Sequence, residues 1–232
     1  MSSIPEKRQP AQQPDTRRRL LDAAERVLME NGFEGASMRM ITAEAGVNLA
    51  AANYHFGSKE GLIEAVFRRR LAWLNEERMR RLDALEAAAA GEPLRPSQIL
   101  EAFFGTLFQM GEDEELGGMV FLRLVGRTLT EPAAFIRNFF AGAYDDVVRR
   151  YKKALVVSLP GVPEEEIAWR FHFMLGAMSY AISGIDSLRV VGGLDVTDEI
   201  PDALAAKRLR ARLMPFLLGG LRAPLPGTGG TA

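Results

Sequence analysis

The chain has 232 residues, 47% of them hydrophobic, which is enough for one sizeable core or for a small domain and a larger one. The absence of cysteine excludes a disulfide framework and thiolate chemistry, and no apolar run approaches the roughly 20 residues of a membrane span. The amino end lacks the apolar segment of a signal peptide, so we expect a cytoplasmic protein with no membrane contact. The net charge of −1 means that any binding to nucleic acid must come from locally concentrated cations.

Nearly the whole chain between its two ends is predicted to be helical. Residues 1–15 are rich in proline, glutamine and arginine and are expected to form a disordered basic arm, and residues 223–232 are expected to form a disordered tail. Between them, apolar residues recur at spacings of three and four, and no alternating strand pattern is present. The fold class is therefore all-α.

The first helices have the pattern of a helix-turn-helix. A helix is expected from about Thr16 to the glycine cap at Asn31 and Gly32. Ser37 can cap a short second helix, and Gly46 can turn the chain into a third helix from about Asn48 to His55. Ser58 can then cap a long fourth helix that runs toward Ala90.

The third helix combines small side chains with polar and aromatic ones, in the stretch LAAANYHF. A helix that enters the major groove needs small residues so that its backbone approaches the base edges, and longer polar side chains that bind bases or phosphates. Taken singly, each residue has a simpler interpretation as ordinary surface polarity. Together they predict binding to double-stranded DNA by Arg39, Thr42, Asn48, Leu49, Ala50, Ala51, Asn53, Tyr54, His55 and Lys59.

Arginines are concentrated in two places, which suggests a positive face. One cluster lies at the amino end, and the second contains Arg68, Arg69, Arg70, Arg78, Arg80 and Arg81. Such a face can attract phosphate although the total charge is slightly negative. The alternative is that these arginines only solvate helix faces.

The block LLDAAERVLMENGFEGASMRMITAEAGVNLAAANYHFGSKEGL, from Leu20 to Leu62, resembles the DNA-binding domain of the TetR family of bacterial transcriptional repressors. The resemblance implies a nine-helix, two-domain protein, with a DNA-binding domain at residues 16–60 and a helical ligand-binding and dimerisation domain at 61–222. Many members have tyrosine where Asn53 stands and serine where Asn48 stands, so the tyrosine contact to phosphate would pass to Tyr54. The third helix and the segment from Trp169 to Leu188 are also similar to the fatty-acid-responsive PsrA-type regulators.

In the larger domain, proline and glycine separate five further helices, expected near residues 97–111, 112–128, 131–159, 164–188 and 202–221. The helix after Glu164 is apolar on two sides, and one side can pack internally while the other meets a second copy. An entirely internal core is the alternative. A homodimer would also place two reading helices on a palindromic operator. The interface candidates are Trp169, Phe173, Ala177, Tyr180, Gly184, Leu209, Leu213 and Phe216.

This domain is also rich in aromatic and methionine side chains, which usually form a core. With the family resemblance, they suggest a site for a small hydrophobic inducer such as a fatty acid or acyl-CoA. Arg123, Arg127, Arg170 and His172 are candidates to meet its acidic group, although salt bridges or a core histidine are simpler roles for any one of them. The predicted ligand-binding residues are Phe103, Phe104, Phe108, Phe121, Arg123, Phe139, Tyr144, His172, Met174 and Met178.

No motif for catalysis is present. The two histidines and the absence of cysteine argue against a metal site, and no nucleophile motif or phosphate-binding loop is found. We therefore expect neither an enzyme nor a bound cofactor. A helical carrier of lipids or other small molecules, without DNA binding, remains the alternative function.

Overall fold

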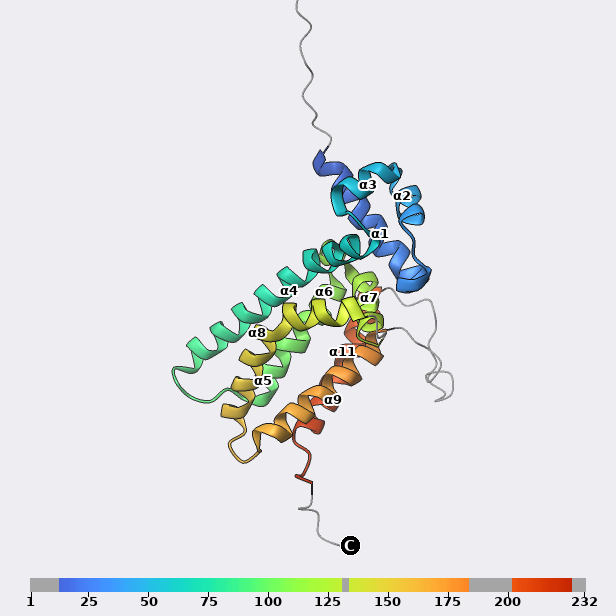
Figure 1. Cartoon of the computed structure of the whole chain (residues 1–232). Helices are drawn as coiled ribbons and strands as arrows, with labels where there is room; N and C mark the ends of the chain where they lie inside the picture. The colour runs from blue at the N-terminus through green and yellow to red at the C-terminus, as the bar shows by residue number, and fades with distance from the viewer. Residues whose placement is uncertain (1–12, 131–133, 184–201, 227–232) are drawn as a thin grey trace, which may run out of the picture. The chain divides into compact units, whose positions relative to one another are not determined.

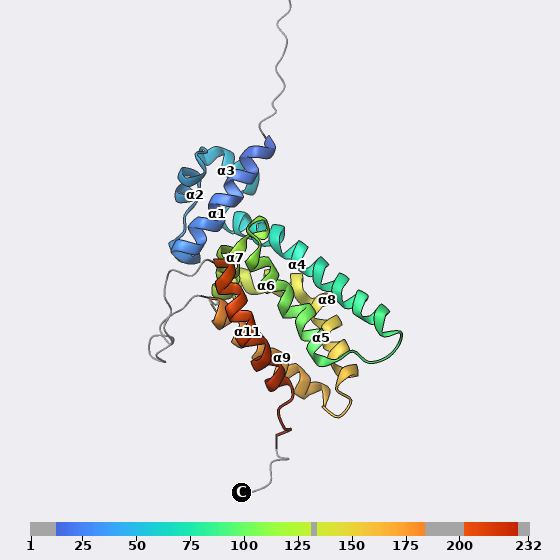
Figure 2. The same ribbon diagram turned by 180° about the vertical axis from the view of Figure 1, so that it is seen from behind.

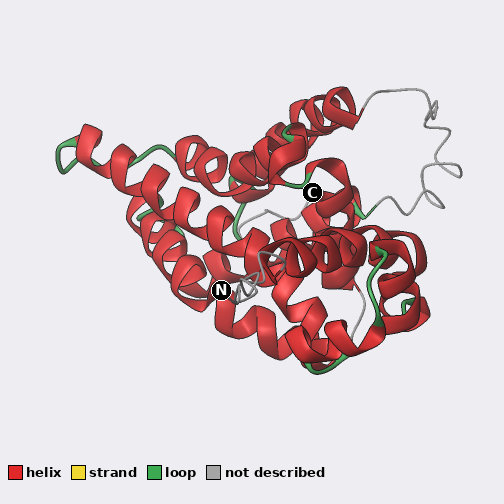
Figure 3. Cartoon of the chain, turned by 90° about the horizontal axis from the view of Figure 1, so that it is seen from above, coloured by secondary structure: helices red, strands yellow, loops and turns green. Residues whose placement is uncertain are grey.

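The computed structural model describes residues 13–130, 134–183 and 202–226, and every regular element within these ranges is helical (Figure 3). The chain divides into two compact units, Met1–Phe67 and Arg68–Ala232. The sequence placed the boundary at residue 60, but the start of the fourth helix belongs to the first unit, where Phe67 stacks on Phe33 at 6.1 Å between ring centroids. The boundary therefore falls inside α4 (Lys59–Ala89).

In the first unit, α1 (Gln13–Gly35), α2 (Met38–Ala45) and α3 (Leu49–Phe56) pack against one another. Gly32 has a φ of 67°, so the predicted stop of the first helix is a kink after which helical geometry resumes as far as Gly35. The predicted inward side chains are buried, because they repeat along one face of each helix. They include Leu20, Ala24, Val27, Leu28, Phe33, Ile41 and Ala45.

The predicted caps at the start of α2 and of α4, and at the end of α2, are confirmed. The Ser37 hydroxyl accepts from the Met40 amide at 3.3 Å, and the Ser58 hydroxyl accepts from the Gly61 amide at 3.1 Å. Gly46 ends α2 in the left-handed region with φ 61°, which a residue without a side chain adopts at little cost. The turn between α2 and α3 is therefore determined by local chemistry.

The second unit is a bundle of helices that can be followed in Figures 1 and 2. With the continuous α5–η1–α6 run counted as one helix, the described part of the chain contains the nine helices expected. Beyond α4, the elements are α5 (Pro96–Leu100), the π-helical turn η1 (Glu101–Gly105), α6 (Thr106–Glu112), the short 3₁₀ helix η2 (Glu114–Leu116), α7 (Gly118–Thr130), α8 (Ala134–Ser158), α9 (Glu164–Ile182) and α11 (Asp202–Leu221).

Two helix boundaries differ from the prediction. The helix expected at 112–128 begins only at Gly118, because Gly117 and Gly118 both have positive φ, 114° and 58°, and separate η2 from α7. The helix expected at 164–188 is described as far as Ile182, and the end predicted for it lies outside the described residues. Neither difference changes the order of the elements.

The core of the second unit lies where α6, α7, α9 and α11 pack together. Both views in Figures 1 and 2 show α9 and α11 side by side. At Gly126 of α7, a Cβ atom would lie 2.5 Å from the Ser183 amide nitrogen, so α7 approaches the end of α9 at a distance that excludes any side chain. Among the described residues, no helix is both long and apolar enough to cross a bilayer.

Candidate nucleic-acid interface

Helix α3 has one buried side and one exposed side. Ala52 is fully buried and packs into the first unit, whereas Ala50 is exposed and Ala51 is half-buried. Leu49, at the start of the helix, is 38% exposed. The three consecutive alanines therefore have different roles: Ala52 lets α3 pack closely on its own unit, and Ala50 leaves the outer surface shallow.

The polar and aromatic residues of α3 lie on its exposed side and at its carboxyl end. Tyr54 is 78% exposed, more than any other large hydrophobic side chain in the described part of the chain, and Asn53 is also exposed. His55 is half-buried against Tyr54, with 5.4 Å between ring centroids. Lys59 follows as the first residue of α4 and is half-buried. Donors and a cation are thus gathered beside a shallow surface, as contact with phosphates and base edges requires.

Three other predicted contact residues, Arg39, Thr42 and Asn48, differ in their exposure and in their hydrogen bonds. Arg39 on α2 is exposed. Thr42 is only 6% exposed and its hydroxyl donates to the Arg39 carbonyl at 3.0 Å, so little of it is accessible and its contact with DNA stays a prediction. The Asn48 side-chain oxygen accepts from the Ala51 amide at 2.7 Å and caps α3, which leaves its amide NH₂ as the group that can contact DNA.

Arg17 and Arg19 of α1 were not among the predicted DNA contacts. They hold α2 and α3 in place, and α3 is the reading helix. Arg19 donates to the carbonyls of Ala45 and Gly46 at 2.6 and 3.2 Å, and so satisfies the end of α2. The Arg17 guanidinium lies 5.5 Å from the centre of the Phe56 ring. Their spacing on α1 gave no signal for these partners, because both contacts link α1 to residues far along the chain.

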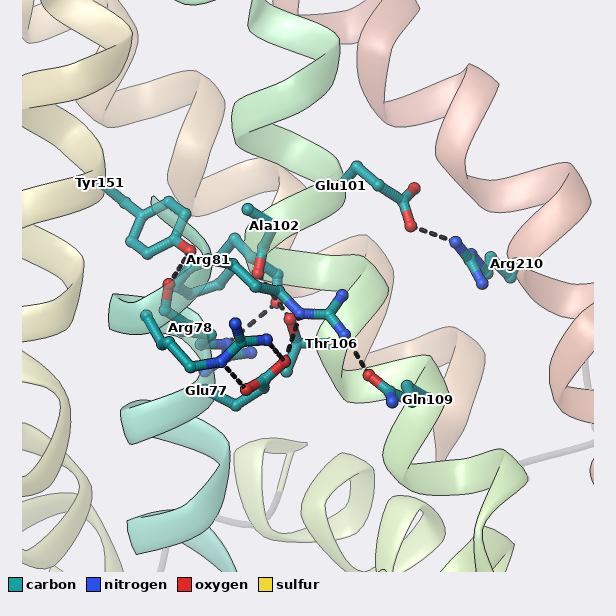
Figure 4. Close-up of polar contacts among 11 residues, drawn as sticks. Glu77, Arg78, Arg81, Glu101, Ala102, Thr106, Gln109, Tyr151 and Arg210 are labelled. Carbon is teal, nitrogen blue, oxygen red and sulfur yellow. Dashed lines mark hydrogen bonds and ion pairs between the residues drawn. The ribbon is translucent and has the colours of Figure 1, made fainter. Parts of the chain in front are cut away.

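The second arginine cluster does not form the continuous positive face expected from the sequence. Arg78 is only 2% exposed. Arg80 and Arg81 both bind the Glu77 carboxylate, at 2.7 Å, and hold the pKa of Glu77 down at about 2. Arg70 donates to the Glu115 carbonyl at 2.7 Å. These side chains are therefore engaged in contacts within the second unit, among them those of Arg78 and Arg81 (Figure 4), although Arg80 itself is exposed.

Most of the predicted ligand-binding aromatics form a packed core. Phe103, Phe104, Phe108 and Phe121 are at most 1% exposed, and Met174 and Met178 are buried as well. The Phe103 ring lies 4.9 to 5.1 Å from the rings of Phe104, Tyr151 and Phe171. Tyr144 is half-buried, and the side chain of Phe139 lies outside the described residues.

The cationic candidates for an acidic ligand are not collected in this core. His172 is exposed on α9, between Trp169 and Phe173, and so lies apart from the packed aromatics, and its contact with a ligand stays a prediction. Arg170 is buried, but it pairs with Glu166 at 2.7 Å and donates to the carbonyl of Leu221 at the end of α11. A further bond from Arg170 reaches the Pro224 carbonyl at 3.3 Å, and so part of the predicted tail is held. Arg123 and Arg127 are half-buried on α7.

An open groove of about 670 Å³ lies between α4 and the α5–η1 segment. Its volume falls in the range of small-molecule sites. The sequence did not indicate this groove, because its two walls are separated by a turn and meet only in the fold. It is lined by Arg80, Arg81, Ala84, Leu85, Ser97, Gln98, Glu101 and Ala102.

The predicted dimer residues of α9 are mostly exposed on one side of the helix. Trp169 is 52% exposed, Phe173 63% and Tyr180 36%, and Ala177 lies half-buried between them. The opposite side, with Phe171, Met178 and Ile182, is buried. Gly184 lies outside the described residues.

Helix α11 contributes less to this exposed apolar surface than the sequence suggested. Phe216 is 66% exposed, Leu209 is half-buried, and Leu213 is 9% exposed and packs within its own unit. Leu213 thus offers little surface in the single chain, and its place in an interface stays a prediction. No group of histidine, cysteine and acidic residues that could hold a metal is found in the described part of the chain.

Two family models match the chain, and together they extend over both units. Residues 20–66 match the model of bacterial regulatory proteins of the tetR family, and residues 101–220 match the tetracyclin repressor-like C-terminal domain. This protein belongs to the TetR family of transcriptional regulators. The family match confirms the DNA-binding domain that the sequence predicted, and the comparisons do not assign the chain to the PsrA-type subgroup.

Individual relatives match over shorter stretches or in fold alone. The chain is 37% identical over 92 residues to the transcriptional regulator BetI of Vibrio vulnificus, a stretch that covers 39% of this chain and 46% of that one. The chain thus matches less than half the length of this relative. The ketosteroid regulator KstR2 of Mycobacterium tuberculosis has the same fold, with a TM-score of 0.61 at 18% identity over 92% of this chain and 98% of that one. FadR of Bacillus subtilis, in complex with stearoyl-CoA, also has this fold, with a TM-score of 0.59 at 14% identity. The match covers 88% of this chain and 98% of that one.

Proposed function

We propose that this protein is a homodimeric TetR-type repressor that binds a palindromic operator through the exposed side of α3 and is released by a small hydrophobic inducer. The observation that carries the proposal is the outer surface of α3, where the exposed Ala50 adjoins Asn53 and the 78% exposed Tyr54. Ala50 and Ala51 allow close approach and contact thymine methyl groups, and Asn53 reads a base. Tyr54, His55 and Lys59 bind phosphates, as do Arg39 and the free amide of Asn48.

The exposed aromatic side of α9 supports the dimer. A monomer that left Trp169 and Phe173 in water would lose the free energy of burying two large rings. Phe216 adds a third exposed ring on α11, a helix that packs beside α9. A second copy offers the same surface and can cover all three residues symmetrically. Two reading helices then meet half-sites about 34 to 36 Å apart.

Release by inducer requires that the ligand bind one conformation of the dimer more tightly than another. Helix α4 is continuous from Lys59, which follows the reading helix, to Ala89 in the second unit. A shift in α4 caused by a ligand would therefore change the position of the phosphate contacts. Coupling of this kind has a free energy of about 1 to 3 kcal/mol. FadR of Bacillus subtilis, a structure of the same fold, is in complex with stearoyl-CoA, and this supports a fatty acid or acyl-CoA as the ligand class that we propose here.

The test is selection of DNA fragments by the purified protein, followed by a mobility-shift assay. We expect an enriched sequence with two inverted half-sites and a complex that weakens steeply as salt is added. Recovery of random sequence with the same affinity would contradict the proposal. A helical carrier of small molecules, the alternative function, would show no DNA complex under the same conditions.

A further inference from the structure

A buried positive charge lies in the second unit without an acidic partner. Arg78 of α4 is 2% exposed, and no carboxylate among the described residues forms an ion pair with it. Its Nε donates to the Phe103 carbonyl at 2.9 Å, while its Nη1 has no hydrogen-bond partner in the described part of the chain. Burial lowers the pKa of Arg78, but a guanidinium stays protonated in proteins. A charge in such a place costs folding free energy unless an anion accompanies it.

Aromatic rings surround this guanidinium. Its central carbon lies 3.9 Å from the centre of the Phe103 ring and 5.7 Å from that of Tyr144. The Tyr151 hydroxyl donates to the Arg78 carbonyl at 2.6 Å and fixes the backbone at this point of α4. The rings attract the cation, but they do not neutralise it. The guanidinium is therefore held in place while part of its hydrogen-bonding capacity stays unused.

The Phe103 carbonyl, which accepts the hydrogen bond from Arg78 Nε, belongs to an unusual turn. Phe103 lies in η1, the π-helical turn Glu101–Gly105, a rare geometry that often marks functional sites. Figure 4 shows Arg78, Ala102 and Thr106 where α4 meets this turn. Ala102, the neighbour of Phe103, lines the open groove, and so does Arg81, one turn after Arg78. Arg78 does not itself line this groove of about 670 Å³, but a residue one turn away on α4 and the neighbour of its hydrogen-bond partner do.

We propose that this protein binds a carboxylate attached to an apolar molecule, with the acidic group paired to Arg78 and the apolar part in the groove between α4 and α5–η1. Ala84, Leu85 and Ala102 supply the apolar walls. The proposal rests on the proposed inducer and names its acidic group and the residue that binds it. Arg78 thereby takes the role for which the sequence suggested Arg123, Arg127, Arg170 and His172.

A carboxylate suits this site better than a phosphate. Arg78 offers one buried charge, Arg80 and Arg81 share the single carboxylate of Glu77 and keep one positive charge between them, and Arg210 is paired with Glu101. A phosphate monoester carries a charge of about −1.5 to −2 and would need a second free cation. Because Arg80 and Arg81 both donate hydrogen bonds to Glu77, a monocarboxylate paired with Arg78 needs no further free cation.

The direct test is a comparison of straight-chain carboxylic acids, from hexanoate to hexadecanoate, with their primary amides, by isothermal titration calorimetry on the wild-type dimer. At least one acid should bind at least about thirtyfold more tightly than its amide, since an unpaired buried charge remains when the acid is replaced. Equal affinities, or no binding by any acid, would overturn the proposal. This comparison needs no variant and does not depend on DNA binding.

Arg78→Gln sharpens the test, because glutamine can still donate to the Phe103 carbonyl but carries no charge. We expect this variant to lose the preference for the acid over the amide. The matched control is Arg149→Gln, an exposed arginine of α8 paired with Asp145 and Asp146, which should keep the preference. A folded Arg78→Gln protein that still prefers the acid would contradict the assignment of Arg78.

A mobility-shift assay separates failure of this proposal from failure of the proposed function. If the acid binds through Arg78 but leaves the DNA complex unchanged, the carboxylate site stands and release by inducer is wrong. If the acid and amide bind alike while DNA binding is normal, the carboxylate site is wrong and the regulator remains. A crystal structure with the tightest acid should place its carboxylate within hydrogen-bond distance of Arg78 Nη1.

Discussion

The two units of this protein place their polar side chains in opposite ways. In the first unit, Asn53 and Tyr54 face water from a short helix whose inner side is closed by Ala52. In the second unit, the guanidinium of Arg78 is enclosed by aromatic rings. Exposed polar groups can contact a large, highly charged partner such as DNA, whereas an enclosed cation can bind only a small anion. The contrast suggests that one chain binds a polyanion on its surface and a monoanion inside.

The largest effect is expected from a charge placed in the exposed aromatic surface of α9. Phe173→Asp should convert the dimer to a monomer, because an aromatic side chain at the centre of an interface often contributes at least about 2 kcal/mol and the aspartate would also be buried unpaired. Analytical ultracentrifugation measures this change. Val157→Asp, at another exposed apolar residue of the same unit, is the matched control and should remain dimeric. A dimeric Phe173→Asp protein would refute the α9 interface.

A substitution in the reading helix should change sequence preference. Asn53→Ala should reduce discrimination at one base pair of each half-site by about 1 to 3 kcal/mol, since the paired donor and acceptor of the amide are lost. Competition binding against single-base variants of the operator measures it. A uniform loss of affinity across all variants would show instead that Asn53 contacts the backbone of DNA.

The turn between α2 and α3 offers a test of stability. Gly46→Ala should lower the free energy of unfolding by about 1 to 2 kcal/mol, because φ is 61° there. Its Cβ would also lie 2.9 Å from Arg19 Nη2 and displace the arginine that caps α2. Urea denaturation measures the change. Gly142→Ala in α8, where a Cβ meets nothing within 4 Å, should instead stabilise the protein by about 0.5 to 1 kcal/mol.

The smallest effect is expected in the pH dependence of the free energy of unfolding, to which Glu77 contributes. Arg80 and Arg81 hold its pKa at about 2 in the folded protein, below its ordinary 4.5. The ionised Glu77 therefore stabilises the folded protein fully above about pH 4.5, and this stabilisation disappears as pH falls toward 2. Urea denaturation across this range should show the stability of wild type and Glu77→Gln converging at low pH, whereas Glu165→Gln, at an exposed residue, should track wild type throughout. A constant difference between wild type and Glu77→Gln would contradict the pairing.

The sequence predicted the first unit better than the second, because its signals are local. Ser37, Gly46 and Ser58 act on neighbouring backbone groups, and their effects can be read from a few residues. The burial of Thr42 was not predicted, because it depends on how α2 packs. In the second unit, Arg78 looked like its neighbours Arg80 and Arg81, and only the packing of α4 on the π-helical turn distinguishes it. The exposure of His172 and the burial of Leu213 were not predicted for the same reason, since both lie on helices that are apolar on more than one side.

We propose above all that the outer side of α3 and the start of α4 bind double-stranded DNA. Fluorescence anisotropy of a selected operator across a series of salt concentrations tests it with wild type and Lys59→Ala. We predict that Lys59→Ala weakens binding to operator and random DNA alike and reduces the slope of log affinity against log salt by about 1, because one phosphate contact is lost. An unchanged affinity and slope would contradict the claim.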